Sequence, residues 1–382
     1  MSETRQKPAR QPEGKVRYAV CGLGWFAQVA VLPAFANAEE SSELVALVSS
    51  DEEKLGVLGD RYDVPPEHRG GYERFEELLD RAEVDAVYVV TPNHLHREFT
   101  VRAARAGVHV LCEKPMAVTE EECREMIAAT DEAGVRLMIA YRLHFEEANL
   151  TAAEIARSGR LGEVRFFSSV FSNLVSDEED IRLNPIELGG GSLYDIGTYC
   201  VNAARYVFAD EPTEVSAMSV LGGGRFADCD ELTAAVMRFP GERLASFTTC
   251  FSTRDHDEYR VQGTRGELVV SPAFTFHGDL AWKLTAGDDE EEERTFPKRD
   301  QVAPEILHFS ECLLTGRRPE PDGNEGLADV KILAALHRSA AEGGRPVRLG
   351  DFPPQRRPTL EQEERRPAQE EPKLVHERAP SS

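Results

Sequence analysis

Short hydrophobic runs alternate with amphipathic segments through the first third of the chain. Buried strands, each apolar on both faces, are predicted for residues 16–20, 43–48, 85–90, 108–111 and 135–140. Helices are predicted between them, among which is one from Glu120 to Ala133. Strands that are apolar throughout and alternate with helices indicate a parallel sheet covered on both faces. The pattern therefore predicts a doubly wound α/β domain, a Rossmann-type parallel sheet, over residues 15–140, after a polar N-terminal arm of residues 1–14.

The pattern changes after Tyr141. Longer strands with alternating polar and apolar positions are predicted for residues 163–174, 213–221, 231–239, 243–251, 258–262 and 267–270. Such alternation is typical of an antiparallel sheet with one covered face, so residues 141–351 are predicted to form an α+β domain with an open, mostly antiparallel sheet. Its helices are expected at about residues 146–158, 192–206, 304–314 and 326–341. Residues 352–382 are rich in Pro, Glu, Gln and Arg, which predicts a disordered tail.

Composition narrows the class of protein. The 382 residues are 41% hydrophobic and 29% charged, as in a globular protein with two full cores. The net charge of −24 argues against a nucleic-acid partner, because phosphate backbones bind clustered Lys and Arg. No stretch approaches the ~20 apolar residues of a membrane helix, and the polar N-terminus is not a secretory signal. Seven cysteines without a Cys-x-x-Cys pair favour reduced thiols in the cytoplasm.

A glycine motif follows the first predicted strand. Gly22-Leu23-Gly24-Trp25-Phe26-Ala27 lies between a strand and a helix, which is the context of a dinucleotide-binding turn. The first glycine permits the tight turn, the second lets the backbone reach a pyrophosphate, and Ala27 permits close helix packing. The alternative is a glycine turn without a ligand.

The end of the second strand bears on which dinucleotide binds. NAD-binding folds usually place an acidic residue there for the ribose 2′-hydroxyl. Here Ser49 and Ser50 end the strand and Lys54 follows in the next turn, which favours the 2′-phosphate of NADP. Asp51 keeps NAD open, because its carboxylate could bind a free ribose.

Two further motifs lie at the carboxyl ends of predicted strands, where such folds bind ligands. They are Thr91-Pro92-Asn93 and Glu113-Lys114-Pro115, and the proline of the second restricts Lys114 to an extended backbone beside the expected nicotinamide. An ordinary solvated lysine is the alternative. His94 and His96 have no Cys or carboxylate at ligand spacing, so no metal site is predicted. The cofactor-binding residues predicted here are Thr91, Pro92, Asn93, His96, Glu113 and Lys114.

Three consecutive glycines, Gly189–Gly191, precede the helix predicted from about residue 192. Glycines have no side chain to bury, so they indicate a close approach of the backbone or a positive φ, interpreted as room for substrate or cofactor. Ser192 can cap the helix. Asp195 and Tyr199 are four residues apart and share one helix face, which makes them a candidate acid/base pair. The alternative is a surface aspartate beside a packed tyrosine.

Together these motifs resemble those of the Gfo/Idh/MocA oxidoreductase family. The resemblance extends from about Lys15 to Pro346, and it is carried by the glycine motif and residues 91–96, 112–117, 141–144 and 189–202. It implies a Rossmann domain followed by an open sheet, through which members commonly form homodimers or homotetramers.

The resemblance also implies roles for single residues. Lys114 matches the catalytic lysine of the family, and Asp195 and Tyr199 match its acid/base pair. Ser49 and Lys54 match positions that hold the 2′-phosphate in the glucose–fructose oxidoreductase branch, to which these motifs are most similar. Further positions that match cofactor contacts there are Tyr72, Arg142 and Arg182.

The implied activity is hydride transfer between a sugar, at C1 of a pyranose, and NADP. Tyr199 would take the hydroxyl proton, the charge of Lys114 would lower the tyrosine pKa, and Asp195 would orient the group. The long export signal of that branch is absent and the arm is short, so permanent retention of the cofactor stays open. Ile181 and Phe251 replace aromatic groups of its sugar site. The alternatives are a sugar 1-dehydrogenase or keto-sugar reductase with an exchangeable cofactor, and a dinucleotide-sensing regulator without activity.

Overall fold

The structure is a computed structural model, and it describes residues 7–287 and 290–378. The chain divides into two compact units. Within the described residues, unit 1 comprises residues 7–142, 300–327 and 365–378, and unit 2 comprises the remainder.

Unit 1 is built on a six-stranded parallel sheet with the strand order β3-β2-β1-β4-β5-β6. The four residues of β4 and the five of β5 are all buried, because helices cover both faces of the sheet. The predicted doubly wound fold is therefore confirmed. Its strands are β1 (Val16–Cys21), β2 (Ser42–Val48), β3 (Arg69–Gly70), β4 (Ala86–Val89), β5 (His109–Glu113) and β6 (Leu137–Ala140).

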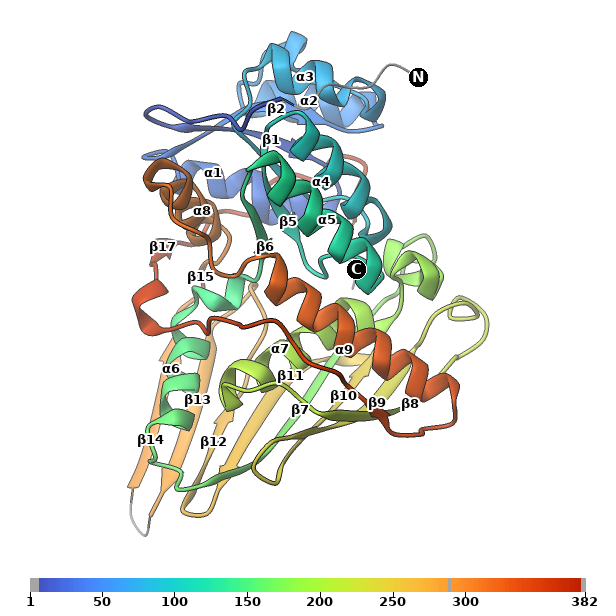
Figure 1. Cartoon of the computed structure of the whole chain (residues 1–382), viewed down its shortest axis with the longest axis vertical. Helices are drawn as coiled ribbons and strands as arrows, with labels where there is room; N and C mark the ends of the chain where they lie inside the picture. The colour runs from blue at the N-terminus through green and yellow to red at the C-terminus, as the bar shows by residue number, and fades with distance from the viewer. Residues whose placement is uncertain (1–6, 288–289, 379–382) are drawn as a thin grey trace. The chain divides into compact units, whose positions relative to one another are not determined.

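The helices of unit 1 follow local capping signals. Helix α5 has a capping box between Thr119 and Glu122 at its start and Gly134, with φ of 68°, at its end, so its bounds are those predicted. Figure 1 shows α4 beside α5, and the two helices pack together. The helices are α1 (Leu32–Asn37), α2 (Glu52–Arg61), α3 (Phe75–Arg81), α4 (His96–Arg105), α5 (Glu120–Ala133) and α8 (Ala303–Thr315), and the π-helix η1 (Ala27–Val31) leads into α1.

Helix α8 belongs to unit 1, although the sequence placed residues 304–314 in the second domain. The Ser310 hydroxyl lies 2.8 Å from both the Tyr18 and the Ser42 hydroxyl oxygens, and all three side chains are buried. Helix α8 also packs against α1 and against strands β1 and β2. The amphipathic pattern of this segment predicts a helix but carries no information on which core the helix covers.

Unit 2 is built on a nine-stranded sheet with the order β14-β13-β12-β11-β7-β10-β9-β8-β16. Strands β7 and β10 are parallel and the other neighbours whose register is described are antiparallel, which confirms the predicted open, mostly antiparallel sheet. The strands are β7 (Val164–Leu174), β8 (Glu214–Val220), β9 (Leu232–Phe239), β10 (Arg243–Cys250), β11 (Ser252–Gly263), β12 (Gly266–Val270), β13 (Leu280–Ala286), β14 (Glu290–Phe296) and β16 (Val347–Arg348).

The two faces of this sheet differ. Buried and exposed residues alternate along β9, so one face is covered and the other is open. The covered face packs against helices of unit 2, of which α7 contacts β7 and α6 contacts β12 and β13. The longest helices with residues in unit 2 are α6 (Glu147–Arg157), α7 (Thr198–Phe208) and α9 (Gly323–Ala341), and α9 begins in unit 1. The two short strands β15 (Arg299–Asp300) and β17 (Arg366–Pro367) complete the regular structure.

The segment after Phe352 differs from the predicted disordered tail. In unit 2 the Arg357 guanidinium donates to Glu211 at 2.6 Å. In unit 1 the Arg366 guanidinium pairs with the Glu40 carboxylate, and Val375 is buried. Composition misses these contacts because a few ion pairs and one apolar residue hold an otherwise polar segment. Residues 379–382 of the predicted tail lie outside the described residues.

The N-terminal arm lies at the amino ends of the parallel strands. The Lys7 and Arg10 backbone N–H groups donate to Arg105 O at 3.1 Å and Gly107 O at 2.9 Å, just before β5 begins. His109, the first residue of β5, faces Arg10 O through Nε2 at 2.9 Å. Residues 1–6 of the predicted arm lie outside the described residues.

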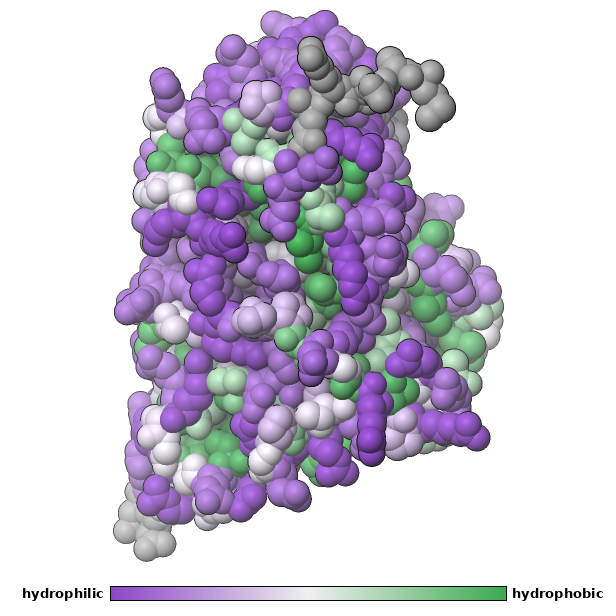
Figure 2. Space-filling view, in the orientation of Figure 1, coloured by the Kyte–Doolittle hydropathy of each residue, from purple (hydrophilic) through white to green (hydrophobic). Residues whose placement is uncertain are grey.

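Hydrophilic residues predominate on the face of the molecule in Figure 2, with hydrophobic residues scattered among them. Each of the seven cysteines is a buried thiol. None of the helices in residues 7–287 and 290–378 is long and apolar enough to cross a membrane.

Candidate active site

The two glycines of the loop after β1 have different surroundings. Gly22 has φ of 100°, and a Cβ there would lie 2.4 Å from Val90 O. No other residue therefore fits where the chain leaves β1 beside the end of its parallel neighbour β4. A Cβ on Gly24 would meet nothing within 4 Å, at the point where the helix begins. The backbone N–H groups of a helix start attract anions. Open space at Gly24 therefore fits the pyrophosphate of a dinucleotide beside Leu23, Trp25, Phe26 and Ala27.

The end of β2 brings the predicted 2′-phosphate residues together. Ser49 is buried and its hydroxyl accepts from the Asp51 N–H at 3.2 Å, whereas Ser50 is exposed. Asp51 is the N-cap of α2 and accepts from the Lys54 N–H at 3.0 Å. Partial burial acts to raise the pKa of Asp51, but the hydrogen bonds from Lys54 and His376 outweigh it and hold the pKa below its usual value. The Asp51 carboxylate is therefore already hydrogen-bonded to the start of its own helix.

The two motifs at the ends of β4 and β5 are joined by His96. Its buried ring faces Thr91 O at 2.8 Å through Nε2 and Pro115 O at 3.0 Å through Nδ1. Burial lowers the pKa of His96, which keeps the ring neutral. Two carbonyl contacts are the environment of a positioning histidine rather than of a metal ligand. Pro92 and Asn93 continue from Thr91 into a short 3-10 turn, Asn93–Leu95.

The Thr91 hydroxyl is buried without a hydrogen-bond partner among the described residues. A buried polar atom left unpaired costs about 1–3 kcal/mol, so such groups usually meet a ligand or water. Thr91 lies at the carboxyl end of β4, where doubly wound folds bind ligands. An unpaired hydroxyl in this place fits a bound dinucleotide.

Lys114 follows the buried Glu113, whose charge acts on a second buried acid, Glu305. Glu113 accepts from the Tyr88 hydroxyl at 2.8 Å and from the Lys114 N–H at 3.2 Å. Burial raises the pKa of Glu113, and burial together with the Glu113 charge raises that of Glu305. The Arg142 guanidinium, also buried, donates to Gln301 and opposes the rise for both carboxyls. Glu113 therefore holds the start of the Lys114 turn, and the Arg142 charge stabilises the Glu113 carboxylate.

Tyr72 begins a short turn between β3 and α3. Its ring packs against Phe99, with the centroids 4.9 Å apart. Burial raises the pKa of Tyr72 to about 12, so the phenol stays protonated.

In unit 2 the Asp195 carboxylate is held by Arg182. Arg182 Nε donates to Asp195 Oδ2 at 2.8 Å, and Nη1 donates to Asp180 Oδ2 at 3.1 Å. The Asp195 side chain is 25% exposed, so it remains accessible. Arg182, predicted as a cofactor contact, is thus the partner of the candidate acid/base residue.

Ser192 does not cap the helix as predicted. Its own backbone is helical and its hydroxyl donates to Asp230 Oδ2 at 2.7 Å, while the Leu193 N–H donates to the same oxygen at 2.8 Å. The cap is therefore the buried Asp230, which lies just before β9.

The three glycines have a local cause in unit 2. Gly189 and Gly191 have φ of 79° and 99°. A Cβ on Gly190 would lie 1.7 Å from Asn184 O, and one on Gly191 would lie 2.2 Å from Asp230 Oδ1. The interpretation of these glycines as room for a ligand is corrected at Gly190 and Gly191, because the Asn184 backbone and the Asp230 side chain fill the space there.

Tyr199 lies where the helix changes geometry. Residues 193–197 form a π-helical turn that leads into α7, and such turns are frequent at functional sites. The partly exposed Tyr199 ring packs against Phe171 and Phe274, with centroid distances of 5.6 and 5.9 Å. The aromatic contacts hold the ring of Tyr199 in place, and its role as an acid/base residue stays a prediction.

Comparison with known proteins identifies the family. Residues 16–141 match a model described as an oxidoreductase family with an NAD-binding Rossmann fold. Residues 149–269 match the GFO/IDH/MocA C-terminal domain. The chain belongs to the GFO/IDH/MocA oxidoreductase family. Its GFO/IDH/MocA membership, predicted from the motifs, is therefore confirmed, as is its class as an oxidoreductase.

Individual relatives cover most of the chain. D-xylose 1-dehydrogenase [NADP(+)] of Haloarcula marismortui is 35% identical over 343 residues, 88% of this chain and 94% of the relative. The crystal structure of aldose-aldose oxidoreductase from Caulobacter crescentus complexed with glycerol is 41% identical, with a TM-score of 0.82, and the match covers 88% of this chain and all of that one. A 3-ketoreductase from Actinomadura kijaniata in complex with NADP and TDP-benzene is 27% identical, with a TM-score of 0.77 over 85% of this chain and 98% of that one.

The predicted site residues of this GFO/IDH/MocA chain divide between its units. Lys114 and most of the predicted cofactor residues lie in unit 1, whereas Arg182, Asp195 and Tyr199 lie in unit 2. Residues that the sequence did not point to include Asp180 and Asp230 in unit 2 and Gln28, Glu305 and Glu377 in unit 1. Only Gln28 carries a local signal, because it is a polar residue in an apolar helix next to the glycine motif.

Proposed function

We propose that this chain is an NADP-dependent sugar oxidoreductase that acts on the hydroxyl or carbonyl at C1 of a pyranose. The observation that carries the proposal is the accessible Asp195 carboxylate held by Arg182, four residues before Tyr199. The relatives support the substrate class, because they include a D-xylose 1-dehydrogenase and an aldose-aldose oxidoreductase.

NADP is the proposed cofactor. Ser49 and Lys54 offer a hydroxyl and an ammonium at the end of β2, where a 2′-phosphate would bind. Asp51 is occupied by the N-terminus of α2 and by His376, so it is less available for a free ribose. The residues proposed to hold the dinucleotide are those of the glycine loop with Ser49, Ser50, Lys54, Tyr72, Thr91, Pro92, Asn93, His96, Glu113, Lys114, Arg142 and Arg182.

The proposed catalytic residues are Lys114, Asp195 and Tyr199. A bound nicotinamide supplies the hydride acceptor or donor. The Tyr199 phenol accepts the proton of the sugar hydroxyl in oxidation and returns it in reduction. The Lys114 ammonium group is proposed to assist this proton transfer. Arg182 keeps the Asp195 carboxylate in place to orient the reacting group.

Exchange of the cofactor between turnovers is favoured over permanent retention. The described part of the N-terminal arm contacts Arg105, Gly107 and His109, at the amino ends of the strands of unit 1. The glycine loop lies at their carboxyl ends. Residues 7–14 of the arm therefore do not contact the glycine loop, and we expect the protein to need added NADP, as a simple sugar 1-dehydrogenase or keto-sugar reductase would.

A second copy of the chain is the proposed occupant of the open sheet face. Phe166, Val170 and Leu174 on β7, Met218 on β8 and Val236 on β9 are apolar and between 40% and 71% exposed. Exposed apolar patches of this kind mark interaction sites. We expect a homodimer or homotetramer by light scattering, and Val170→Glu should shift it toward the monomer. A wild-type monomer would contradict this part of the proposal. We also propose that the protein is cytoplasmic, in line with its buried thiols.

The test is the NADPH absorbance change across a panel of aldoses, ketoses and keto-sugars. Tyr199→Phe and Lys114→Ala should each lose about 10²- to 10⁴-fold in turnover, the usual value of general acid/base help, and still bind NADP. The matched controls are Tyr62→Phe, on a partly exposed residue, and Lys283→Ala, on an exposed one, both outside the site. Turnover at the wild-type rate in either site variant would refute the assignment. A wild type that binds NADP but reacts with no sugar would be a regulator instead.

A further inference from the structure

The C-terminal segment, Val375–Glu377, is docked beside the glycine loop of unit 1. The Gln28 amide donates to Val375 O at 2.9 Å and accepts from the Val375 N–H at 2.8 Å. The same amide donates to Leu23 O, within the glycine loop, at 3.1 Å. Gln28 is fully buried and the Val375 side chain is buried. Two reciprocal hydrogen bonds and a buried side chain define a specific position for this segment.

The next two residues reach the end of β2. Glu377 Oε1 lies 2.5 Å from Lys54 Nζ, and the exposed fractions of the two side chains are 25% and 12%. His376 Nδ1 lies 2.9 Å from Asp51 Oδ2, and Nε2 lies 3.0 Å from Glu53 Oε2. The charged groups that face His376 are thus Asp51, Glu53 and Lys54.

Glu377 and a 2′-phosphate need the same ammonium group. Lys54 is the cation proposed to receive that phosphate, and Glu377 already pairs with it. A phosphate brought to Lys54 would also meet the negative charges of Asp51 and Glu377 at close range. Since like charges in a partly buried corner repel, binding of the phosphate requires the Glu377 carboxylate to leave.

We propose that Glu377 is a cofactor-selecting residue: its carboxylate competes with the 2′-phosphate of NADP for Lys54 and lowers the preference of the chain for NADP over NAD. The inference rests on the proposed dinucleotide binding. NAD lacks the phosphate and does not compete with Glu377. When NADP binds, the C-terminal segment leaves Lys54 and gives up its hydrogen bonds to Gln28.

Dissociation constants of NADP and NAD for the full-length chain test the proposal, measured by isothermal titration at low ionic strength. Glu377→Gln should tighten NADP binding by about three- to ten-fold, between the values of an exposed and a buried charge pair, and leave NAD binding unchanged. Glu370→Gln removes the same charge from an exposed position of the same tail and should change neither constant. Added salt should shrink the difference between Glu377→Gln and the wild type, because it screens the competing charge.

Hydrogen exchange supplies the second measurement. NADP should speed exchange of the Val375 amide, which donates to Gln28, whereas NAD should not. An unchanged NADP constant in Glu377→Gln would overturn the proposal and leave the proposed function intact. Weaker NADP binding would overturn it too, because the segment would then hold the cofactor. If the wild type binds neither dinucleotide, the proposed function fails and the inference falls with it.

Discussion

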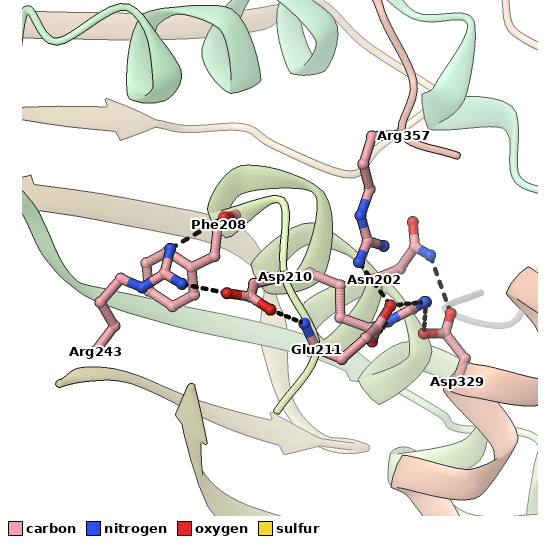
Figure 3. Close-up of polar contacts among 8 residues, drawn as sticks. Asn202, Phe208, Asp210, Glu211, Arg243, Asp329 and Arg357 are labelled. Carbon is pink, nitrogen blue, oxygen red and sulfur yellow. Dashed lines mark hydrogen bonds and ion pairs between the residues drawn. The ribbon is translucent and has the colours of Figure 1, made fainter. Parts of the chain in front are cut away.

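Replacement of Arg205 by methionine tests how the helix that carries Tyr199 is held in unit 2. Arg205 lies on α7 and is fully buried. Its Nε and Nη2 donate to Glu211 at 2.7 and 2.8 Å, and its Nη1 donates to Asp329 on α9 at 2.6 Å. Figure 3 shows this network together with Asn202, which donates to Asp329, and Arg357, which donates to Glu211.

The expected loss of stability depends on which partners Glu211 and Asp329 keep after Arg205 is replaced. Glu211 keeps its ion pair with the Arg357 guanidinium at 2.6 Å, so loss of Arg205 costs little free energy at Glu211. Asp329 is fully buried and loses its guanidinium, although the Asn202 amide stays at 3.1 Å. Removal of one partner of a buried ion pair costs about 3–5 kcal/mol, and methionine fills most of the vacated volume. Arg205→Met should therefore lower the free energy of unfolding of unit 2 by about 3–5 kcal/mol.

Urea denaturation followed by tryptophan fluorescence measures this loss. The chain has two tryptophans, and Trp282 is buried in unit 2, so a Trp25→Phe background reports unit 2 alone. Arg243→Met is the control, because Arg243 pairs with the 38% exposed Asp210 near the end of the same helix (Figure 3). Its loss should be about 1 kcal/mol, the value of an exposed pair.

A double variant completes the cycle. Arg205→Met with Asp329→Asn also removes the buried negative charge of Asp329 and should be more stable than Arg205→Met alone. The reasoning is refuted if Arg205→Met costs no more than the Arg243 control, or if the double variant is the less stable of the two.

Three further substitutions probe unit 1. Burial raises the pKa of Glu305 well above 4.5, so the folded chain keeps a proton that the unfolded chain loses as pH rises past that value. Glu305→Gln should therefore raise the melting temperature at pH 8 but not at about pH 4.5, by calorimetry. Thr91→Val should leave the melting temperature of the unliganded protein unlowered, since the hydroxyl has no partner among the described residues, yet weaken NADP binding in titrations. The hydrogen bond to Asp51 and the charge of Glu53 raise the pKa of His376 above 6.5. Docking of the C-terminal segment should therefore be firm at pH 6 and loosen as pH rises through that raised pKa, and His376→Gln should remove this step in hydrogen exchange.

The sequence predicts most elements of the fold for identifiable reasons. The residues of strand β5 are all buried. Thr119 and Glu122 cap the start of α5, and Gly134 ends it. Strand β14 was missed because six of its seven residues are exposed and acidic or polar, so no alternation marks it. It exists because its backbone pairs with β13. Backbone pairing with a neighbouring strand leaves no trace in the composition of an exposed strand.

Contacts within the candidate site are also not predicted from local sequence. Motifs at strand ends identify Thr91 and Lys114 as candidates, because parallel strands present their carboxyl ends at one edge. Helical spacing to Asp195 identifies Tyr199. The partners that act on such residues come from far along the chain, as Asp230 does for the helix start at Leu193. Glu377 lies 323 residues after Lys54 and belongs to a polar tail, so nothing near either residue indicates their contact.

The position of α8 has a consequence for how the protein is made. The parallel sheet of unit 1 is complete at Ala140, but Tyr18 and Ser42 are covered by Ser310, which leaves the ribosome much later. At usual rates of synthesis the delay is roughly ten to thirty seconds. During that time the nascent sheet has an uncovered apolar flank, while all strands of the open sheet of unit 2 except β16 are being made. A fragment that ends near residue 142 would keep that flank exposed, so we expect it to aggregate where the full chain folds.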